Sequence, residues 1–275
     1  MNDYIKFLGT AGARFVVSRQ LRSSAGIWCR FSGKNFLIDP GPGTLYQCFA
    51  DTHCFNPEDL EGIIISHRHI DHSSDLNIMT EAMTSGTFNK KGKVLLPEDA
   101  VLEEPVLYRY LREAVGELVY LKEGESNQLG EGIYLQTPVR HVHGVETYGL
   151  KFETPYYSVS FIVDSRPFDE IAKNYRSDIL VMNVVLYRPV EHKKVQHLDM
   201  DSAGEIIKEV QPRVAVLTHF GMTMLKHNPR EIAEHLSDKT GVPVLAASDG
   251  YCLYPGKYVE CKNDKVLSRE IKQDN

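Results

Sequence analysis

Three histidines and an aspartate fall within six residues of this sequence, a density of metal-binding side chains that solvated loops rarely reach. The four are His67, His69, Asp71 and His72. Imidazole and carboxylate groups are ligands that Zn²⁺, Fe²⁺ and Mn²⁺ accept in proteins. On an extended chain, residues two apart point the same way, so His67 and His69 can converge on one ion. Asp71 and His72 fall where the chain is expected to turn into a helix, which lets them face a second ion.

One segment cannot complete the coordination of two ions, so ligands from later in the chain are required. His141 and His143 follow an apolar run that ends at Thr137, and both are candidates. Asp164 and His219 each stand at the end of another apolar run. A carboxylate such as Asp164 would be costly to bury at a strand end without a cation beside it. Together these side chains supply what the first cluster lacks.

The elements expected to position these side chains are strands and helices in alternation. An apolar, β-branched run at 62–66 directly precedes the histidine cluster and is typical of a strand buried on both faces. Thr44 is expected to cap a helix that runs to residue 50. The other expected strands lie at 4–8, 27–31, 35–38, 94–97, 118–121, 133–138, 148–153, 158–163, 178–184, 214–217 and 243–246, and the other helices at 74–85, 199–210 and 229–239. Two mixed sheets packed face to face with helices outside would bury these runs in one domain over residues 1–275.

This set of motifs resembles the metallo-β-lactamase superfamily, and its ribonuclease Z-like branch in particular. The run from His67 to His72 has the pattern His-x-His-x-Asp-His. The later motifs stand around His143, which the resemblance selects over His141, and around Asp164 and His219. The superfamily's first aspartate matches Asp39, and the similarity runs in order from about residue 5 to residue 220.

The resemblance implies an α/β fold, a four-layer αββα sandwich of the metallo-β-lactamase type, with the site at one edge between the sheets. Asp164 would bridge two divalent ions, expected to be zinc with manganese or iron as alternatives, and a hydroxide shared by the ions would be the nucleophile. Asp39 would hold a ligand imidazole by its distal N–H. Asp71 and His197 would be the catalytic residues. One ion would take His67, His69 and His143, and the other Asp71, His72 and His219.

His197 matches a histidine that this branch uses beside the scissile phosphate, where a group that titrates near neutral pH is needed. The chain departs from ribonuclease Z at the strand that precedes it. There a histidine–glutamate pair follows the strand and the glutamate polarises the catalytic-side histidine, whereas this sequence has Met182 and Asn183. Asn183 is expected to orient His197 by a hydrogen bond without supplying a charge, which would leave His197 less basic.

A second departure concerns the substrate. Only 21 positions separate His143 from Asp164, enough for one hairpin and too few for the long arm with which tRNA-processing relatives grip their substrate. The net charge of −6, with no dense Lys/Arg run, also disfavours a large nucleic acid. The leading hypothesis is therefore a phosphodiesterase that acts on a small molecule or a short, single-stranded nucleic acid.

Other functions stay open at this stage. The alternatives are a tRNA 3′-processing endoribonuclease, a carboxyl-ester, thioester or lactone hydrolase, and a metal-binding module without turnover. A homodimer is also open. No apolar stretch of about 18 residues and no signal-peptide pattern are found, so a cytoplasmic protein without a membrane partner is expected. The five cysteines form no C-x-x-C pair, which disfavours cysteine ligation and a disulfide framework.

Overall fold

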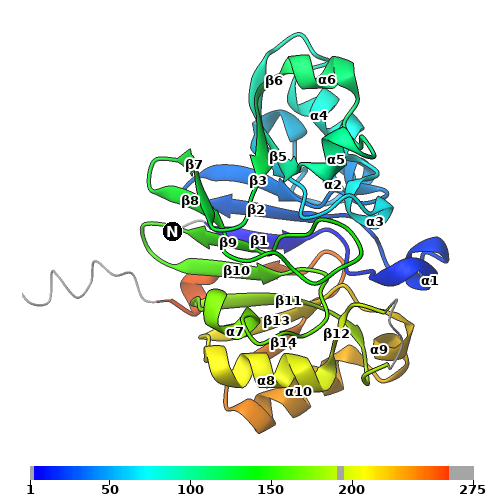
Figure 1. The fold of residues 1–275 in the computed structure, drawn as a ribbon, viewed down its shortest axis with the longest axis vertical. Helices are drawn as coiled ribbons and strands as arrows, with labels where there is room; N and C mark the ends of the chain where they lie inside the picture. Colours follow the sequence, from blue (N-terminus) through cyan, green and yellow to red (C-terminus); the bar gives the residue numbers. More distant parts are fainter. Residues whose placement is uncertain (1–2, 191–194, 260–275) are drawn as a thin grey trace, which may run out of the picture.

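The structure, a computed structural model, describes residues 3–190 and 195–259. The single domain was expected over residues 1–275. Some of these positions, including His192 and Cys261, therefore lie outside the described residues. Two sheets pack face to face with helices on their outer faces (Figure 1), which confirms the expected αββα arrangement. Among the described residues, no helix combines the length and the apolar character that crossing a membrane requires.

The first sheet is built mainly from the N-terminal half. Its three pairings from β15 to β3 are antiparallel and its three pairings from β3 to β6 are parallel. The polypeptide therefore leaves β3 and β4 at the same edge of the sheet. In order across the sheet, the strands are β15 (Cys252–Leu253), β1 (Tyr4–Phe7), β2 (Ile27–Phe31), β3 (Lys34–Ile38), β4 (Leu60–Ile64), β5 (Lys91–Pro97) and β6 (Val115–Leu121).

The second sheet repeats this plan with the C-terminal half. The pairings from β14 to β10 are parallel, and those from β10 to β7 are antiparallel. In order across the sheet, the strands are β14 (Val244–Ala246), β13 (Val214–Thr218), β11 (Ile179–Leu186), β10 (Ser158–Ile162), β9 (Leu150–Glu153), β8 (Ile133–Thr137) and β7 (Glu125–Gly130), with β12 (Leu198–Asp199) paired to β11. β9 and β10 form the single hairpin expected between His143 and Asp164.

The helices lie in two groups (Figure 1). The first sheet carries α2 (Thr44–Ala50), α3 (Ile70–Ser73), α4 (Leu76–Met83), α5 (Asp99–Leu102) and α6 (Arg109–Ala114). The second sheet carries α7 (Ile171–Asn174), α8 (Met200–Val210), α9 (Met222–Lys226) and α10 (Pro229–Thr240). α1 (Ala13–Ser18) projects at the edge where α3 lies. Two short 3₁₀ turns, η1 (Pro57–Asp59) and η2 (Pro255–Lys257), complete the fold.

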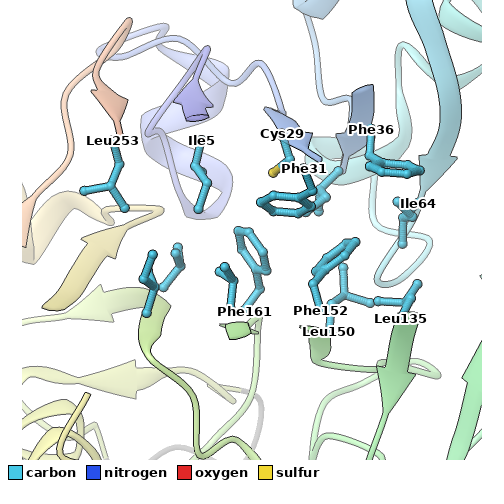
Figure 2. Packing of buried hydrophobic residues seen from close by; sticks show 14 of the residues in the cluster. Ile5, Cys29, Phe31, Phe36, Ile64, Leu135, Leu150, Phe152, Phe161 and Leu253 are labelled. Carbon is cyan, nitrogen blue, oxygen red and sulfur yellow. The ribbon is translucent and has the colours of Figure 1, made fainter. Parts of the chain in front are cut away.

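Strand periodicity divides the apolar side chains between the central layer and the outer layers. Phe36 and Ile64 face the space between the sheets, whereas Leu37 and Ile63 face the helices. Figure 2 shows residues of the two inner faces meeting, and the rings of Phe31 and Phe152 pack with centroids 5.0 Å apart. Burial of these apolar faces is the main force that holds the two sheets together and so fixes the strand ends that carry the site.

Three local expectations need correction. Gly43, with φ +87°, caps α2, and Thr44 is its first residue, because the Thr44 hydroxyl is buried and donates to the Gly41 carbonyl. The strand expected at 62–66 begins at Leu60 and ends at Ile64. The helix expected at 74–85 is the shorter α4 at 76–83, and it is separated from α3 because the Asp75 amide donates to the Pro40 carbonyl. β7 was not expected, because its sequence is polar and largely exposed.

The ion pair of Lys6 and Asp51 should contribute measurably to stability. Their side chains are 7% and 14% exposed, and Nζ lies 2.5 Å from Oδ2. Burial opposes ionisation of Asp51, but hydrogen bonds from Lys6 and His53 lower its pKa to about 2. Because the folded-state pKa is depressed, this contribution is present above the ordinary pKa near 3.8 and is lost as the pH falls through about 2. Asp51→Asn should therefore lower the free energy of unfolding by about 2 kcal/mol at neutral pH.

Urea titrations of the wild type and Asp51→Asn from about pH 7 down to about pH 3 would measure this difference. Glu61→Gln is the matched control, because the Lys34–Glu61 pair is nearly half exposed and should contribute less than about 1 kcal/mol. An equal cost for the two variants at neutral pH, or a cost for Asp51→Asn that does not shrink in acid, would contradict the assignment.

Candidate metal centre

The strand ends bring the expected ligands to one edge of the sandwich. The polypeptide leaves β4 at Ile64 and reaches His67, and it leaves β10 at Ile162 and reaches Asp164. His219 directly follows β13, and its φ of +57° turns the backbone sharply there. The first sheet thus supplies His67, His69, Asp71 and His72, and the second supplies His143, Asp164 and His219.

The first group comprises His67, His69 and His143, whose potential ligand atoms lie within 4.8 Å of one another. His69 Nδ1 and His143 Nε2 are 3.1 Å apart. Two ligands held about 2.0–2.1 Å from one zinc ion in tetrahedral geometry lie about 3.3 Å apart. Burial, together with the neighbouring His143, lowers the pKa of His69 to about 4, so this imidazole is neutral and has a lone pair free.

The second group comprises Asp71, His72 and His219, again with ligand atoms within 4.8 Å of one another. Asp71 Oδ2 lies 3.9 Å from His72 Nε2 and 3.8 Å from His219 Nε2. Burial opposes protonation of His72, but the nearby carboxylates of Asp39 and Asp71 outweigh it and raise its pKa well above the usual value. The centre thus attracts positive charge on this side.

Asp164 lies between the two groups. Its Oδ2 is 4.0 Å from Nε2 of His67 and 3.6 Å from Nε2 of His72, and its Oδ1 is 3.5 Å from Nε2 of His219. The side chain is only 3% exposed. Burial opposes its ionisation, yet electrostatic attraction to the neighbouring His219 and His197 side chains holds its pKa well below the usual range. A buried carboxylate that stays ionised is available to cations on both sides.

Three histidine nitrogens at the centre have no hydrogen-bond partner in the part of the chain that the structure describes. Within the described residues, Nε2 of His67, His72 and His219 is buried and makes no hydrogen bond. A buried polar atom left unsatisfied costs about 1–3 kcal/mol, so three at one place need an explanation. Cations bound between these nitrogens and the two carboxylates would satisfy all three. The residues present therefore fit the divalent ions that the sequence predicts.

Asp39 orients two of these imidazoles. Its Oδ2 lies 2.9 Å from His72 Nδ1 and accepts a hydrogen bond of 2.6 Å from the Ser66 hydroxyl. Ser66 Oγ in turn lies 3.0 Å from His67 Nδ1. With Nδ1–H donated in each ring, Nε2 of both rings keeps its lone pair for a ligand. The φ of +49° at Asp39 is sparsely populated by non-glycine residues, and such strain is typical of functional sites.

Gln196 gives His143 the same kind of support. His143 Nδ1 lies 3.1 Å from the Gln196 carbonyl, which fixes the tautomer that leaves Nε2 free. His197, the next residue, has its Nδ1 3.5 Å from Asp164 Oδ2, and its side chain is 19% exposed. Burial is the main cause that lowers the pKa of His197, and Asp164 offsets part of the effect. This direction agrees with the expectation of a less basic histidine.

The expected role of Asn183 was wrong. Its Nδ2 donates a 2.9 Å hydrogen bond to Asp164 Oδ1, and no hydrogen bond to His197 occurs in the described residues. The reason is sheet geometry. Asn183 lies within β11, one position past Met182, which forms the last pair with Ile162 of β10, and Asp164 follows β10. His197 instead precedes β12 at the same end.

His141 lies outside the centre, although it is only two residues from His143. Its ring packs 5.4 Å from that of Tyr175, and it is 3% exposed. Burial lowers its pKa to about 4. Residues two apart on an extended chain would point the same way. Here the backbone bends at residues 143–145, so the two histidine rings take different directions.

Several supporting residues were missed from the sequence. Ser66 could have been suspected, because it directly precedes the first histidine at the end of a buried strand. Arg68 pairs with Asp99 at 2.5 Å, and the Asp99 carboxylate also accepts from the Glu146 amide. This network ties the loop of His67 and His69 to the loop of His143. No local sequence pattern indicates this network, because its members lie far apart in the sequence.

Residues 34–220 match the profile described as the β-lactamase superfamily domain. An uncharacterized protein of Methanocaldococcus jannaschii is 28% identical over 270 residues, which cover 94% of this chain and 98% of its own. The probable metallo-hydrolase YhfI of Bacillus subtilis is 26% identical over 204 residues, 73% of this chain and 81% of its own. The ribonuclease Z of Archaeoglobus fulgidus is 33% identical over 129 residues, 44% of this chain and 39% of its own, and supports the ribonuclease Z-like branch.

Solved structures show the same fold. The crystal structure of YhfI from Bacillus subtilis superposes with a TM-score of 0.73 at 19% identity, covering 91% of this chain and 98% of that one. A diphosphatase from the PhnP family gives 0.68 at 19% identity, covering 92% and 97%. The short form of human tRNase Z gives 0.65 at 17% identity, covering 91% and 98%.

Proposed function

This chain belongs to the β-lactamase superfamily, and from that premise we propose that it is a metal-dependent phosphodiesterase acting on a small or single-stranded phosphodiester. The observation that carries the proposal is the position of His197, a partly exposed imidazole beside the central carboxylate Asp164. A group that can protonate a leaving oxygen next to a cation-binding centre is what phosphodiester hydrolysis requires. The fold itself implies divalent ions.

The proposed ligands follow the two observed groups. His67, His69 and His143 would hold one ion, Asp71, His72 and His219 would hold the other, and Asp164 would contact both. When bound, such a pair supplies Lewis-acid charge and a water of lowered pKa. The predominance of imidazole favours zinc over manganese or iron.

The protein's own catalytic groups would be His197 and Asp71. As the bond between phosphorus and the leaving oxygen breaks, His197 would donate a proton to that oxygen. The attacking water would release one proton to solvent, and His197 would regain a proton from solvent. Asp71 is the more exposed of the two central carboxylates, at 16% against 3% for Asp164, and so can reach the substrate side. Asp39 would hold the imidazoles of His72, directly, and of His67, through Ser66, in the orientation that metal binding needs.

Two observations support a small or unpaired substrate over a folded RNA. The segment between His143 and Asp164 forms only the β9–β10 hairpin, and the chain carries a net charge of −6. The similarity to a diphosphatase from the PhnP family fits a small substrate that contains phosphate. The similarity to ribonuclease Z keeps precursor tRNA as the second candidate.

A substrate panel tests the proposal. Protein freed of metal and reconstituted with Zn²⁺ or Mn²⁺ is given bis-p-nitrophenyl phosphate, cyclic nucleotides, short single-stranded oligonucleotides, a precursor tRNA, and p-nitrophenyl and thioester acyl substrates. Turnover that requires metal on one of the first three supports the proposal. Cleavage of the precursor tRNA alone would favour tRNA 3′ processing, and turnover of the acyl substrates alone would favour an ester or thioester hydrolase.

Asp39→Asn should weaken metal binding without unfolding the protein. Oδ2 of Asp39 accepts from both Ser66 and His72, while Oδ1 accepts from the Ser66 amide at 2.7 Å. With asparagine at this position, the side-chain NH₂ group would face at least one of these donors and could not accept its hydrogen bond. Loss of such support typically raises the metal dissociation constant by about 10–100-fold, measured by competition with a chelator.

The control for this prediction is Asp75→Asn. The Asp75 carboxylate accepts from the Leu45 amide, and among the described residues it forms no hydrogen bond or ion pair with a central histidine. Its metal affinity should stay that of the wild type. If Asp39→Asn bound zinc as tightly as Asp75→Asn, the orienting role of Asp39 would have to be abandoned.

A further inference from the structure

Asn183 occupies a place between the two strand ends that lead to the centre. β11 lies between β10 and β13 in the second sheet, and Asn183 pairs with Thr218 across from it. Thr218 directly precedes His219, and Asp164 follows β10 by two residues. The side chain of Asn183 is thereby enclosed, with 8% of its surface exposed.

The two oxygens of Asp164 have different surroundings. Oδ2 lies within 4.0 Å of Nε2 in His67, His72 and His143. Oδ1 accepts the hydrogen bond from the Asn183 amide and lies 3.5 Å from His219 Nε2. The carboxylate can rotate about its terminal bond unless a contact prevents it, because this torsion is broad.

We infer that Asn183 is a positioning residue that fixes the orientation of the Asp164 carboxylate, so that Oδ2 is the oxygen offered to both ligand groups. The inference rests on the proposed metal ligands and goes beyond them. An amide suits this role because Nδ2 can only donate, so it occupies Oδ1 without competing for a cation. It also stabilises the ionised carboxylate while adding no charge of its own.

A carboxylate at position 183 would have the opposite effect on Asp164. A glutamate here can only accept when ionised, so it would repel Asp164 instead of donating to it. In this chain the strand beside β11 is β10, which leads to Asp164, the residue proposed to contact both ions. The side chain at position 183 therefore acts on cation binding, and its effect on His197 passes through Asp164.

The test is Asn183→Leu, which keeps the shape of the side chain and removes the donor. The dissociation constant for Zn²⁺ should rise by about 10–100-fold in a chelator competition. The visible absorption of the Co²⁺-substituted protein, which reports ligand geometry, should shift in position or intensity. Asn183→Gln, which retains the donor on a longer side chain, should recover part of the affinity. The melting temperature of the metal-free protein should change little.

Val184→Ala is the matched control, because Val184 is the next residue of β11 and packs against the outer helices. It should lower stability and leave both metal readouts unchanged. Wild-type affinity and spectrum in Asn183→Leu would overturn the inference while leaving the proposed function intact, as would an equal loss of affinity in Val184→Ala. A wild-type protein that bound neither Zn²⁺ nor Co²⁺ would overturn both.

Discussion

Asp164→Ala should abolish the tight binding of two metal ions and, with it, the hydrolysis of any substrate. The central carboxylate lies within 4.0 Å of nitrogens from five histidines, and no other acidic side chain among the described residues stands between the two groups. Without it, two bound cations would lose the negative charge that offsets their mutual repulsion. The loss should exceed the about 100-fold that removal of an outer partner can cost.

Elemental analysis of the purified variant would measure this effect. Metal content should fall from about two ions per chain to one or fewer. His143→Ala is the companion variant, since it removes one ligand from the first group only and should lower the content less. Full metal content in Asp164→Ala would mean that the shell has been assigned wrongly. His141→Ala, which alters a buried histidine outside the centre, should retain both ions.

His197→Ala should leave the metal content unchanged and lower kcat by about 10²–10⁴-fold, the range typical of a lost general acid. The imidazole lies beside Asp164 but belongs to neither ligand group. The loss should be smaller for a substrate with an activated leaving group such as p-nitrophenolate, because that group needs no proton to depart. A general acid predicts this difference between substrates, and a merely structural histidine does not.

His227→Ala serves as the control for this prediction. His227 is exposed, its ring stacks on that of Tyr187 with centroids 3.7 Å apart, and it belongs to neither ligand group. Its kcat should match that of the wild type. The assignment of His197 fails if its replacement removes metal, or if it slows activated and ordinary substrates by the same factor.

The sequence predicted the strands that lead to the site because each is an apolar run that ends at an ionisable residue. The run before His67 and the runs before Asp164 and His219 needed no knowledge of their neighbours. The choice of His143 over His141 came from the resemblance, and the spacing left both open. The structure brings His143 to the centre and packs His141 against Tyr175.

What the sequence could not predict are the lateral contacts. Asn183 was expected to contact His197, fourteen positions later, but the register of β10 and β11 places it beside Asp164. Ser66 was read as part of a strand, whereas its hydroxyl connects Asp39 to His67. Spacing along the chain records which residues follow a strand, and the order of strands across a sheet decides which of them meet.

Each ligand group draws two side chains from the first sheet and one from the second, His143 in one case and His219 in the other. Neither half of the polypeptide therefore contains all the ligands of one group. A cation held in either group would cross-link the halves at their shared edge, opposing their separation in proportion to its binding free energy. Metal binding, which catalysis would require, and the packing of the two similar halves would then be thermodynamically coupled. Removal of metal would therefore weaken the packing of the two sheets at the edge where substrate enters.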